Sequence, residues 1–359
     1  MQLLLVYFIA ILITCLDAQL QLVHVFFRHG SRTPELKDIY PTDPFNAETF
    51  APMGYGALTP KGQNMSFKLG HLLRQKYDSF LGDIYTPDIV KAYSTDFDRT
   101  KMTALLVLAG LFPPSKSQKF NDKLAWMPIP YHYDKDPYDY TLRRPNAYCP
   151  AYMKELEEVL SSEEVQREMK ANRDFFKYIA EKTKKPMNTL GDVFGVYQTL
   201  NAEESMNLTL PEWAQSVYPE QLHAMAAKQC NYENYNTVLK RLNGGRMLGQ
   251  IIKQMSAKSR NLLREKIFLY SGHENNLINI LAALNLFKPH VPKYSAAVIV
   301  ELHQNGVKVL YLRDVTSEPE VQKLEGCDVL CPLDDFIRIT RPHVPGNYTA
   351  ECHSHVNLD

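Results

Sequence analysis

The sequence lacks an excess of either charge. Its 359 residues include 40 Lys and Arg and 40 Asp and Glu, and no run of basic residues occurs. Proteins that bind nucleic acids usually present a basic patch, so we expect no nucleic-acid partner. Tandem repeats and low-complexity tracts are also missing. With 45% hydrophobic and 22% charged residues, the composition is typical of a folded globular protein and excludes a disordered chain.

Long hydrophobic runs are missing as well. The longest run after residue 18, residues 104–112, is too short to cross a bilayer, so we expect no membrane anchor. An earlier apolar run, residues 3–13, is followed by the small residue Ala18. This pattern predicts a secretory signal peptide over residues 1–18, although a basic stretch before the run is absent. The alternative is a buried first strand or helix.

Several familiar cofactor motifs are absent. The sequence has no Gly-rich phosphate loop, no zinc-protease motif and no Gly-x-Ser-x-Gly elbow. The pair Gly244-Gly245 favours a helix break or a close contact over a nucleotide site. The C-terminal Cys352-His353-Ser354-His355 has no partner cluster, so we predict no metal site there.

Other features are typical of the secretory pathway. Three Asn-x-Ser/Thr triplets are candidate glycosylation sites, at Asn64, Asn207 and Asn347. Five cysteines follow residue 18, and an odd number leaves at least one without an internal partner. An oxidising compartment favours disulfides over a catalytic thiol.

The order of predicted elements indicates an α/β fold. Alternating β-prone residues predict strands over residues 20–27, 88–94, 267–271, 296–302 and 307–312. Apolar residues at helical spacing predict helices over residues 59–77, 99–111, 154–178, 193–204 and 237–256. We therefore expect a central, mostly parallel sheet flanked by helices, built from residues 19–149 and 261–359. A smaller, mainly helical subdomain is inserted at residues 150–260.

The segment Arg28-His29-Gly30-Ser31-Arg32-Thr33-Pro34 directly follows the first strand. Ligands of open α/β sheets bind at the carboxyl ends of strands. The guanidinium fork fits phosphate oxygens, a neutral imidazole can act as a nucleophile, and Gly30 would let the backbone approach a ligand closely. The segment predicts a site that holds a phosphoryl group against His29. The alternative is a turn whose arginines pair with surface acids.

A second polar segment, residues 94–100, also follows a strand and opens a helix. Helix N-termini attract anions, and Arg99 would add a third cation to the site. The alternative has Asp96 or Asp98 capping the helix while the Arg99 side chain is solvated.

A third segment, residues 271–276, ends another strand. His273 can donate a hydrogen bond to a phosphate oxygen, and Glu274 has the right chemistry for a general acid. A lone His-Glu pair at a turn is more often structural, but its place at a third strand end favours the catalytic interpretation.

Together these segments resemble the histidine acid phosphatases, a branch of the phosphoglycerate-mutase-like superfamily. The pattern Arg28-His29-Gly30-x-Arg32-x-Pro34 is similar to the family signature, and the resemblance covers nearly the whole chain after residue 18. Residues 94–100 and 111–114 resemble the prostatic and lysosomal members. Residues 81–86 and 271–274 resemble the insect venom members most closely.

The resemblance implies a role for each matching residue. His29 would be the nucleophile that forms a phosphohistidine. The phosphoryl oxygens would be bound by Arg28, Arg32, Arg99 and His273. Glu274 occupies the position of the proton donor, where the prostatic type has Asp, so the carboxyl group moves by one methylene. No metal or organic cofactor is implied.

The resemblance also implies two disulfides, Cys149–Cys352 and Cys327–Cys331, which leave Cys230 without an evident partner. We expect a secreted, extracellular acid phosphatase, monomeric or homodimeric, that hydrolyses phosphate monoesters of small molecules or proteins; a lysosomal location is the second expectation. An acid optimum is expected because the donor must carry its proton.

Rival interpretations stay open. A phytase or a lysophosphatidate phosphatase would share the fold with a narrower substrate range. A secreted binding protein with a relic pocket is disfavoured by the intact Arg and His residues, although Glu274 leaves some room for it. A mutase is disfavoured by the predicted signal peptide and the glycosylation triplets, because mutase substrates are cytosolic.

Overall fold

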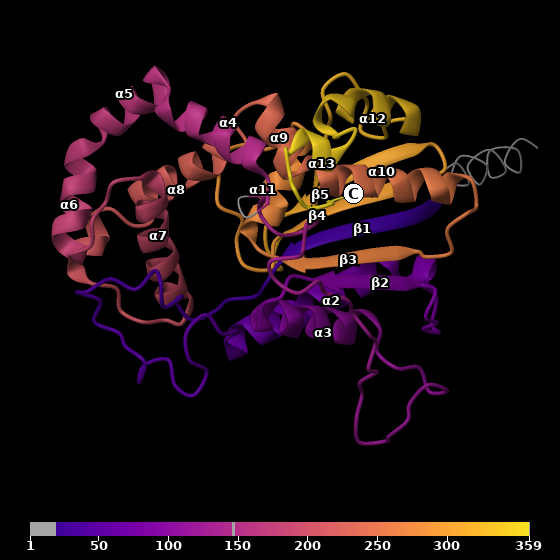
Figure 1. Ribbon diagram of the computed structural model, residues 1–359. Helices are drawn as coiled ribbons and strands as arrows, with labels where there is room; N and C mark the ends of the chain where they lie inside the picture. Colours follow the sequence, from indigo (N-terminus) through magenta and orange to yellow (C-terminus); the bar gives the residue numbers. More distant parts are fainter. Residues whose placement is uncertain (1–18, 146–147, 359) are drawn as a thin grey trace, which may run out of the picture.

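The computed structural model describes residues 19–145 and 148–358, so the predicted signal peptide lies outside the described residues. Its centre is a six-stranded sheet with the order β2-β3-β1-β4-β5-β6 (Figure 1). The strands are β1 (Leu20–Arg28), β2 (Val90–Ser94), β3 (Ile267–Gly272), β4 (Ala297–His303), β5 (Gly306–Leu312) and β6 (Glu320–Gln322).

The α/β class is confirmed, but the sheet is mixed rather than mostly parallel. Strands β2, β3 and β1 pair in parallel. Strands β4, β5 and β6 add to β1 in successive antiparallel pairs. The short connection at Gln304-Asn305-Gly306 explains the antiparallel pairing of β4 and β5, because a tight turn can join only antiparallel strands, whereas parallel strands need a long crossover.

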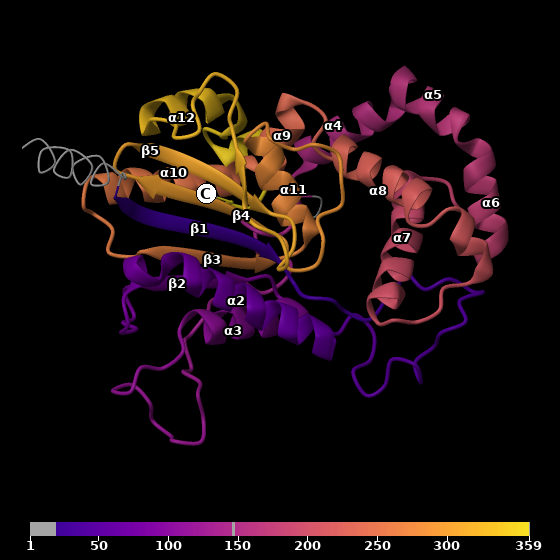
Figure 2. The ribbon, with the colours of Figure 1, turned by 180° about the vertical axis from the view of Figure 1, so that it is seen from behind.

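Two helices cover one face of the sheet, α2 (Pro60–Leu81) and α3 (Asp98–Leu111) (Figure 2). Helix α2 begins as its sequence predicts, with the Thr59 hydroxyl accepting from Gly62 N and Pro60 in the first turn. Alternate residues of β1, such as Val23, Val25 and Phe27, pack against these helices. This burial of apolar side chains fixes the direction of β1 and thus the place where it ends.

The opposite face is covered by α10 (Gly245–Ser259) and α11 (Glu274–Ala283), which pack on the other alternate residues of β1, Leu22 and Phe26. Helix α12 (Leu333–Thr340) lies beside them (Figure 1). The predicted insertion at residues 150–260 therefore includes one helix, α10, that packs on the sheet. The helix predicted over residues 237–256 is interrupted at Gly244, just before α10. A Cβ atom at Gly244 would lie 2.0 Å from Asn279 O, so the close contact requires glycine there.

A helical layer stands beside the sheet, on the left in Figure 1. It contains α4 (Pro150–Ser161), α5 (Glu163–Ala171), α6 (Arg173–Thr183), α7 (Leu190–Ser205), α8 (Glu220–Tyr232) and α9 (Thr237–Asn243). The helix predicted over residues 154–178 is thus three helices. Ser162 caps the second of them through its side chain, which explains the first break. The layer has its own apolar core, which includes Val193, Leu200 and Leu222.

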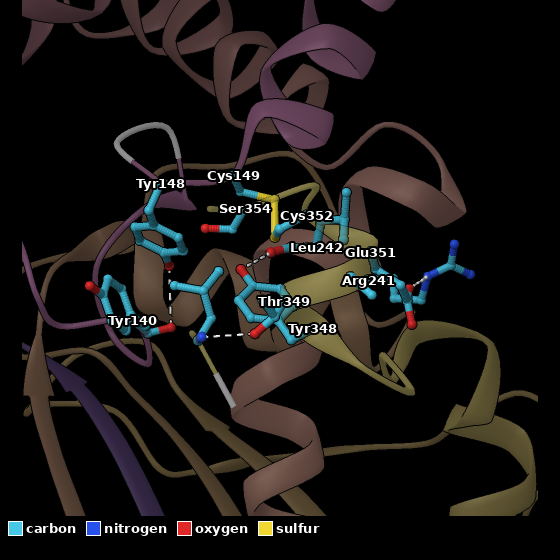
Figure 3. The surroundings of a disulfide bond; sticks show 12 residues. Tyr140, Tyr148, Cys149, Arg241, Leu242, Tyr348, Thr349, Glu351, Cys352 and Ser354 are labelled. Atoms are coloured by element: carbon cyan, nitrogen blue, oxygen red, sulfur yellow. Dashed lines mark hydrogen bonds and ion pairs between the residues drawn. A yellow bond between two sulfur atoms is a disulfide. The ribbon is translucent and has the colours of Figure 1, made fainter. Parts of the chain in front are cut away.

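Two disulfides are present within the described residues, and they are the pairs that the family resemblance implied. Cys149, just before α4, is bonded to Cys352, just after α13 (Tyr348–Glu351), so the C-terminal segment is tied to the helical layer (Figure 3). Cys327 is bonded to Cys331 across a short loop. Cys230 is a buried thiol without a disulfide. Disulfides indicate an extracellular or lumenal protein.

Among residues 19–145 and 148–358, no helix is both long enough and apolar enough to cross a lipid bilayer.

Candidate active site

The three polar segments meet at one edge of the sheet. Arg28 at the end of β1 lies opposite Gly272 of β3, and Ser94 at the end of β2 lies opposite Ser271. Because the three parallel strands end in register, the residues that follow them converge on one cavity of about 370 Å³. The predicted site residues that line it are His29, Arg32, Arg99, His273 and Glu274.

His29 has one ring nitrogen fixed and one available. Its side chain is buried, and Nδ1 lies 2.8 Å from the carbonyl oxygen of Gly30. A carbonyl can only accept, so Nδ1 carries the hydrogen and Nε2 keeps its lone pair. Burial, and then the nearby guanidinium groups of Arg99 and Arg28, hold the pKa of His29 well below its ordinary value. The ring is therefore neutral and nucleophilic in mild acid.

Gly30 makes a close backbone contact with the start of α2. A Cβ atom there would lie 2.1 Å from Gly62 O, and a Cβ atom at Gly62 would lie 2.0 Å from Ser31 O. The two glycines let the loop after β1 lie directly on the first turn of α2. This contact with α2 alone requires glycine at residue 30, and the close approach of a ligand to the backbone there stays a prediction.

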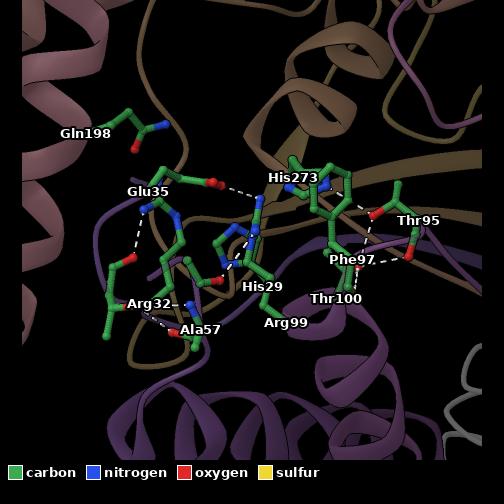
Figure 4. Close-up of polar contacts among 12 residues, drawn as sticks. His29, Arg32, Glu35, Ala57, Thr95, Phe97, Arg99, Thr100, Gln198 and His273 are labelled. Atoms are coloured by element: carbon green, nitrogen blue, oxygen red, sulfur yellow. Dashed lines mark hydrogen bonds and ion pairs between the residues drawn. The ribbon is translucent and has the colours of Figure 1, made fainter. Parts of the chain in front are cut away.

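Arg99 and Arg32 lie beside the His29 ring (Figure 4). Arg99 is buried at the N-terminus of α3, with Nη2 2.7 Å from Glu35 Oε1 and its guanidinium 4.6 Å from the centre of the Phe97 ring. Burial lowers the pKa of Arg99 to about 10, so it stays a cation in acid. The solvated alternative for Arg99 is therefore wrong. Arg32 donates through Nη1 to Thr33 O at 2.9 Å.

Arg28 is placed differently from the other two arginines. Its Nη1 donates to Pro292 O at 2.5 Å, its Nη2 donates to Gln198 Oε1 at 3.2 Å, and its Nε lies 3.2 Å from Glu274 Oε2. It does not line the cavity that holds His29. Arg28 therefore positions Glu274 in this structure, and its direct contact with a phosphoryl group stays a prediction.

Glu274 is the first residue of α11 and is held at both carboxylate oxygens. Oε1 accepts from Gln198 Nε2 at 2.9 Å, and Oε2 faces Arg28. Burial by itself raises the pKa of Glu274, but Arg28 and His273, together with the backbone N–H at the helix start, bring it down to about 2. Without a ligand, this carboxyl group is ionised across the acid range.

His273 completes the group of predicted site residues around His29. Its Nε2 lies 3.0 Å from Thr95 Oγ1, and its ring contacts the edge of Phe97 with the ring centres 4.8 Å apart. Burial and the cation of Arg99 hold the pKa of His273 well below its ordinary value. A neutral imidazole can donate one hydrogen bond.

Sequence reasoning missed several side chains that the fold brings to the cavity. Gln198 comes from α7 and connects Arg28 to Glu274. Glu35 lies just beyond the recognised loop and neutralises Arg99. Arg144 lines the cavity with Glu233, at the end of α8. No motif marked them, because each reaches the site only through packing of the helical layer or the loop against the sheet edge.

The other candidate sites are surface features. Asn64, Asn207 and Asn347 are all exposed, and their glycosylation stays a prediction. Within the described ranges, no group of three or more His, Cys, Asp or Glu side chains could hold a metal ion.

Comparisons with known proteins agree on one family. The model of the "Histidine phosphatase superfamily (branch 2)" matches residues 19–316. The chain is 38% identical to a venom acid phosphatase of Apis mellifera, over 94% of this chain and 88% of that protein. It is 35% identical to human lysosomal acid phosphatase, over 93% of this chain and 80% of that protein.

Solved structures show the same fold at much lower identity. The Citrobacter braakii phytase superposes with a TM-score of 0.68 at 18% identity, covering 93% of this chain and 99% of that one. The Hafnia alvei phytase in complex with tartrate gives 0.69 at 18% identity, covering 94% and 99%.

Proposed function

This chain belongs to branch 2 of the histidine phosphatase superfamily and is a phosphoric monoester hydrolase, and on that premise we propose a secreted acid phosphatase that acts through a phosphohistidine at His29. One observation carries the proposal. The His29 ring is fixed by Gly30 O at Nδ1, which leaves the Nε2 lone pair in a cavity that Arg32 and Arg99 also line.

In the first half-reaction, Nε2 of His29 attacks the phosphorus atom in line with the ester oxygen. The N–P bond forms as the P–O bond to the alcohol breaks, and the proton of Glu274 passes to the departing oxygen. Arg32 and Arg99 supply positive charge where the phosphoryl oxygens lie, which lowers the barrier to transfer. The products are the alcohol, phosphohistidine and the Glu274 carboxylate.

In the second half-reaction, a water molecule attacks the phosphohistidine. The Glu274 carboxylate takes one proton from that water, the N–P bond breaks, and the electron pair returns to Nε2. Inorganic phosphate leaves, and Glu274 then releases this proton, because the unliganded site favours the carboxylate. His29 is regenerated in its neutral form, with Nδ1 still donating to Gly30 O.

The proton on Glu274 has to come with the substrate. In the unliganded site its pKa is about 2, because Arg28 and His273 favour the carboxylate. A bound phosphate monoester adds negative charge beside Glu274 and raises that pKa. The monoester itself loses its second proton near pH 6, so below that pH it arrives with a proton to share. Hydrolysis should therefore be fastest in acid.

Secretion is supported by the predicted signal peptide, the exposed triplet asparagines and the two disulfides. One relative is named as a venom enzyme and others as lysosomal enzymes, so a lumenal location is the second candidate.

The test is release of p-nitrophenol from p-nitrophenyl phosphate across the range from acid to alkaline pH, with and without tartrate. We expect an acid optimum, inhibition by the dicarboxylate, and no turnover by His29→Ala at an unchanged melting temperature. Undiminished hydrolysis by that variant, or an optimum above neutrality, would contradict the proposal.

A further inference from the structure

Helix α7 lies between two cavities. On one of its faces, Gln198 lines the cavity that holds His29. On another face, residues at helical spacing line a second cavity of about 670 Å³, namely Tyr197, Asn201 and Glu204. The two cavities share no lining residue. The second one is large enough for a small organic molecule and is also lined from α2, α8, β5 and the segment before β4.

Aromatic rings form much of the wall of this second cavity. Its tyrosines are Tyr197, Tyr218, Tyr294 and Tyr311. The Tyr218 hydroxyl donates to Glu204 Oε2 at 2.7 Å. The Tyr311 hydroxyl donates to His290 Nε2 at 2.7 Å, because His290 Nδ1 carries the hydrogen that it donates to Lys288 O. These two hydroxyl groups therefore have partners within the protein.

The hydroxyl group of Tyr294 does not. The residue is 6% exposed, and its hydroxyl has no hydrogen-bond partner in the described part of the chain. Its ring packs against Arg28, with the guanidinium 4.3 Å from the ring centre. Burial raises the pKa of Tyr197 to about 12 and the nearby Tyr294 hydroxyl adds to the rise, so this hydroxyl lies toward α7. A buried donor without a partner is unfavourable, and its acceptor has to come from outside the chain.

The charges of the second cavity favour a negatively charged ligand. Its charged side chains are Arg28, Lys61, Lys293, Arg313, Glu204 and Asp314. Lys293 pairs with Asp314 at 3.0 Å, and Arg313 pairs with Glu320 at 2.5 Å. Lys61 is exposed and donates to Ser205 O at 3.0 Å, but it forms no ion pair within residues 19–145 and 148–358. Its charge is thus available to an anion.

From these features we infer that the second cavity is a binding site for a small aromatic anion. The rings of the ligand would pack against the tyrosine rings, and its anionic group would accept the hydrogen bond of Tyr294. The positive charge of Lys61 would favour the same group. The inference does not depend on the proposed function, because it concerns a cavity on another face of α7.

The experiment uses 1-anilinonaphthalene-8-sulfonate, an aromatic sulfonate whose fluorescence rises in apolar surroundings. It is titrated into the full chain with and without a saturating concentration of inorganic phosphate, which we expect to fill the cavity that holds His29. One saturable site should appear under both conditions. 2-Naphthoate should displace the probe at a concentration about tenfold lower than decanoate, an aliphatic anion of similar size, because aromatic rings pack favourably on one another.

The first variant, Tyr294→Phe, removes only the unpartnered hydroxyl group. It should weaken binding of the probe about tenfold, the scale of a lost hydrogen bond to a charged group. The melting temperature of the free protein should stay the same or rise, because no contact within the protein is lost. The control is Tyr133→Phe, which removes the hydroxyl of an exposed tyrosine outside the cavity and should bind the probe like the wild type.

The second variant, Lys61→Gln, tests the charge at an exposed position where folding is not at risk. It should weaken binding about threefold at low salt and reduce its dependence on salt. Lys68→Gln, also exposed on α2 but outside the cavity, is its control. Absence of a saturable site, loss of the site when phosphate is added, unchanged affinity in Tyr294→Phe, or equal losses in the variants and their controls would each overturn the inference.

Discussion

The floor and the outer wall of the cavity come from different parts of the molecule. The floor consists of residues that directly follow β1, β2 and β3, among them His29, Arg99 and His273. The wall comes from the helical layer and from the loop before α4, with Phe194, Glu233 and Arg144 as examples. In the proposed function the floor supplies the chemistry of phosphoryl transfer, and we expect the wall to influence which alcohol part can enter.

The two parts also differ in how they are held. The floor is fixed by the register of three parallel strands, whose ends cannot shift independently. The wall is fixed by packing between layers and by side-chain contacts such as Gln198 to Glu274. Changes in the floor should thus reduce every activity, whereas changes in the wall should alter the preference among substrates or the pH dependence.

The largest expected effect concerns an arginine in the floor. Arg99→Ala should reduce kcat/KM for p-nitrophenyl phosphate by about 10³-fold, the scale of an arginine that stabilises a phosphoryl transition state. Arg144→Ala, an arginine of the wall, should reduce it by less than about tenfold for this single-phosphate substrate. Steady-state kinetics on both purified variants checks the contrast, and equal losses would show that floor and wall do not differ in role.

A smaller effect is expected at the proton donor. Glu274→Gln should slow hydrolysis of an alkyl phosphate by about 10²-fold, the lower end of general-acid contributions. The loss should be much smaller for p-nitrophenyl phosphate, because p-nitrophenolate leaves without help from a proton. A ratio of rates for the two substrates that is the same in the variant and the wild type would remove Glu274 from this role.

The next smaller effect is a shift in the pH dependence of kcat when a wall residue, Gln198, is replaced. Gln198 donates to the Glu274 carboxylate and so favours its ionised form. Gln198→Leu should raise the pKa of Glu274, so the donor keeps its proton to higher pH and the alkaline limb of the kcat profile moves upward by about one unit. Gln229→Leu is the control, since that amide donates to Glu233 instead. A limb that stays in place, or moves equally in the control, would contradict the assignment.

The smallest effect on activity is expected where the loop after β1 meets α7. Glu203 of α7 is fully buried beside Asp43 and Tyr40, and burial, followed by the charge of Asp43, raises its pKa from 4.5 to about 9. The folded state thus keeps a proton that the unfolded state releases near pH 4.5. This contribution to stability is complete below pH 4.5, declines as the pH rises, and is lost above about pH 9.

Glu203→Gln should therefore flatten the fall in melting temperature between pH 5 and 9, with little change in kcat at acid pH. Glu204→Gln, at the neighbouring exposed position, should keep the slope of the wild type. Thermal unfolding at several pH values checks this, and parallel curves for wild type and Glu203→Gln would show that the buried carboxyl group does not hold the proton.

The contrast between floor and wall also explains what the sequence could predict. Arg28 to Arg32, Arg99 and the His273-Glu274 pair each follow a strand within a few residues, so local patterns and one rule about strand ends locate them. The α/β class and most helices and strands follow from periodicity in the same way. The turn at Gln304-Asn305-Gly306 predicts that residues 296–302 and 307–312 pair, as β4 and β5 do, but no local pattern predicts that β4 also adds to β1 in the antiparallel direction and makes the sheet mixed.

The remaining features depend on distant contacts that no local pattern encodes. Gln198 lies 76 positions before Glu274, and nothing in the sequence of α7 marks it as a partner. The hydrogen bond from Arg28 to Pro292 O and the close contact of Gly30 with Gly62 likewise form only when the layers pack. Such contacts refine a site whose chemistry is set by the strand ends.

A covalent bond between phosphorus and His29 Nε2 is the central feature of the proposed mechanism, and trapping that phosphohistidine tests the mechanism most directly. The enzyme is mixed with an excess of substrate, quenched in alkali, where phosphohistidine survives, and digested for mass spectrometry. We predict one phosphoryl group on the peptide that contains His29, and none in His29→Ala. A phosphoryl group on another residue, or equal labelling of His29→Ala, would contradict the account.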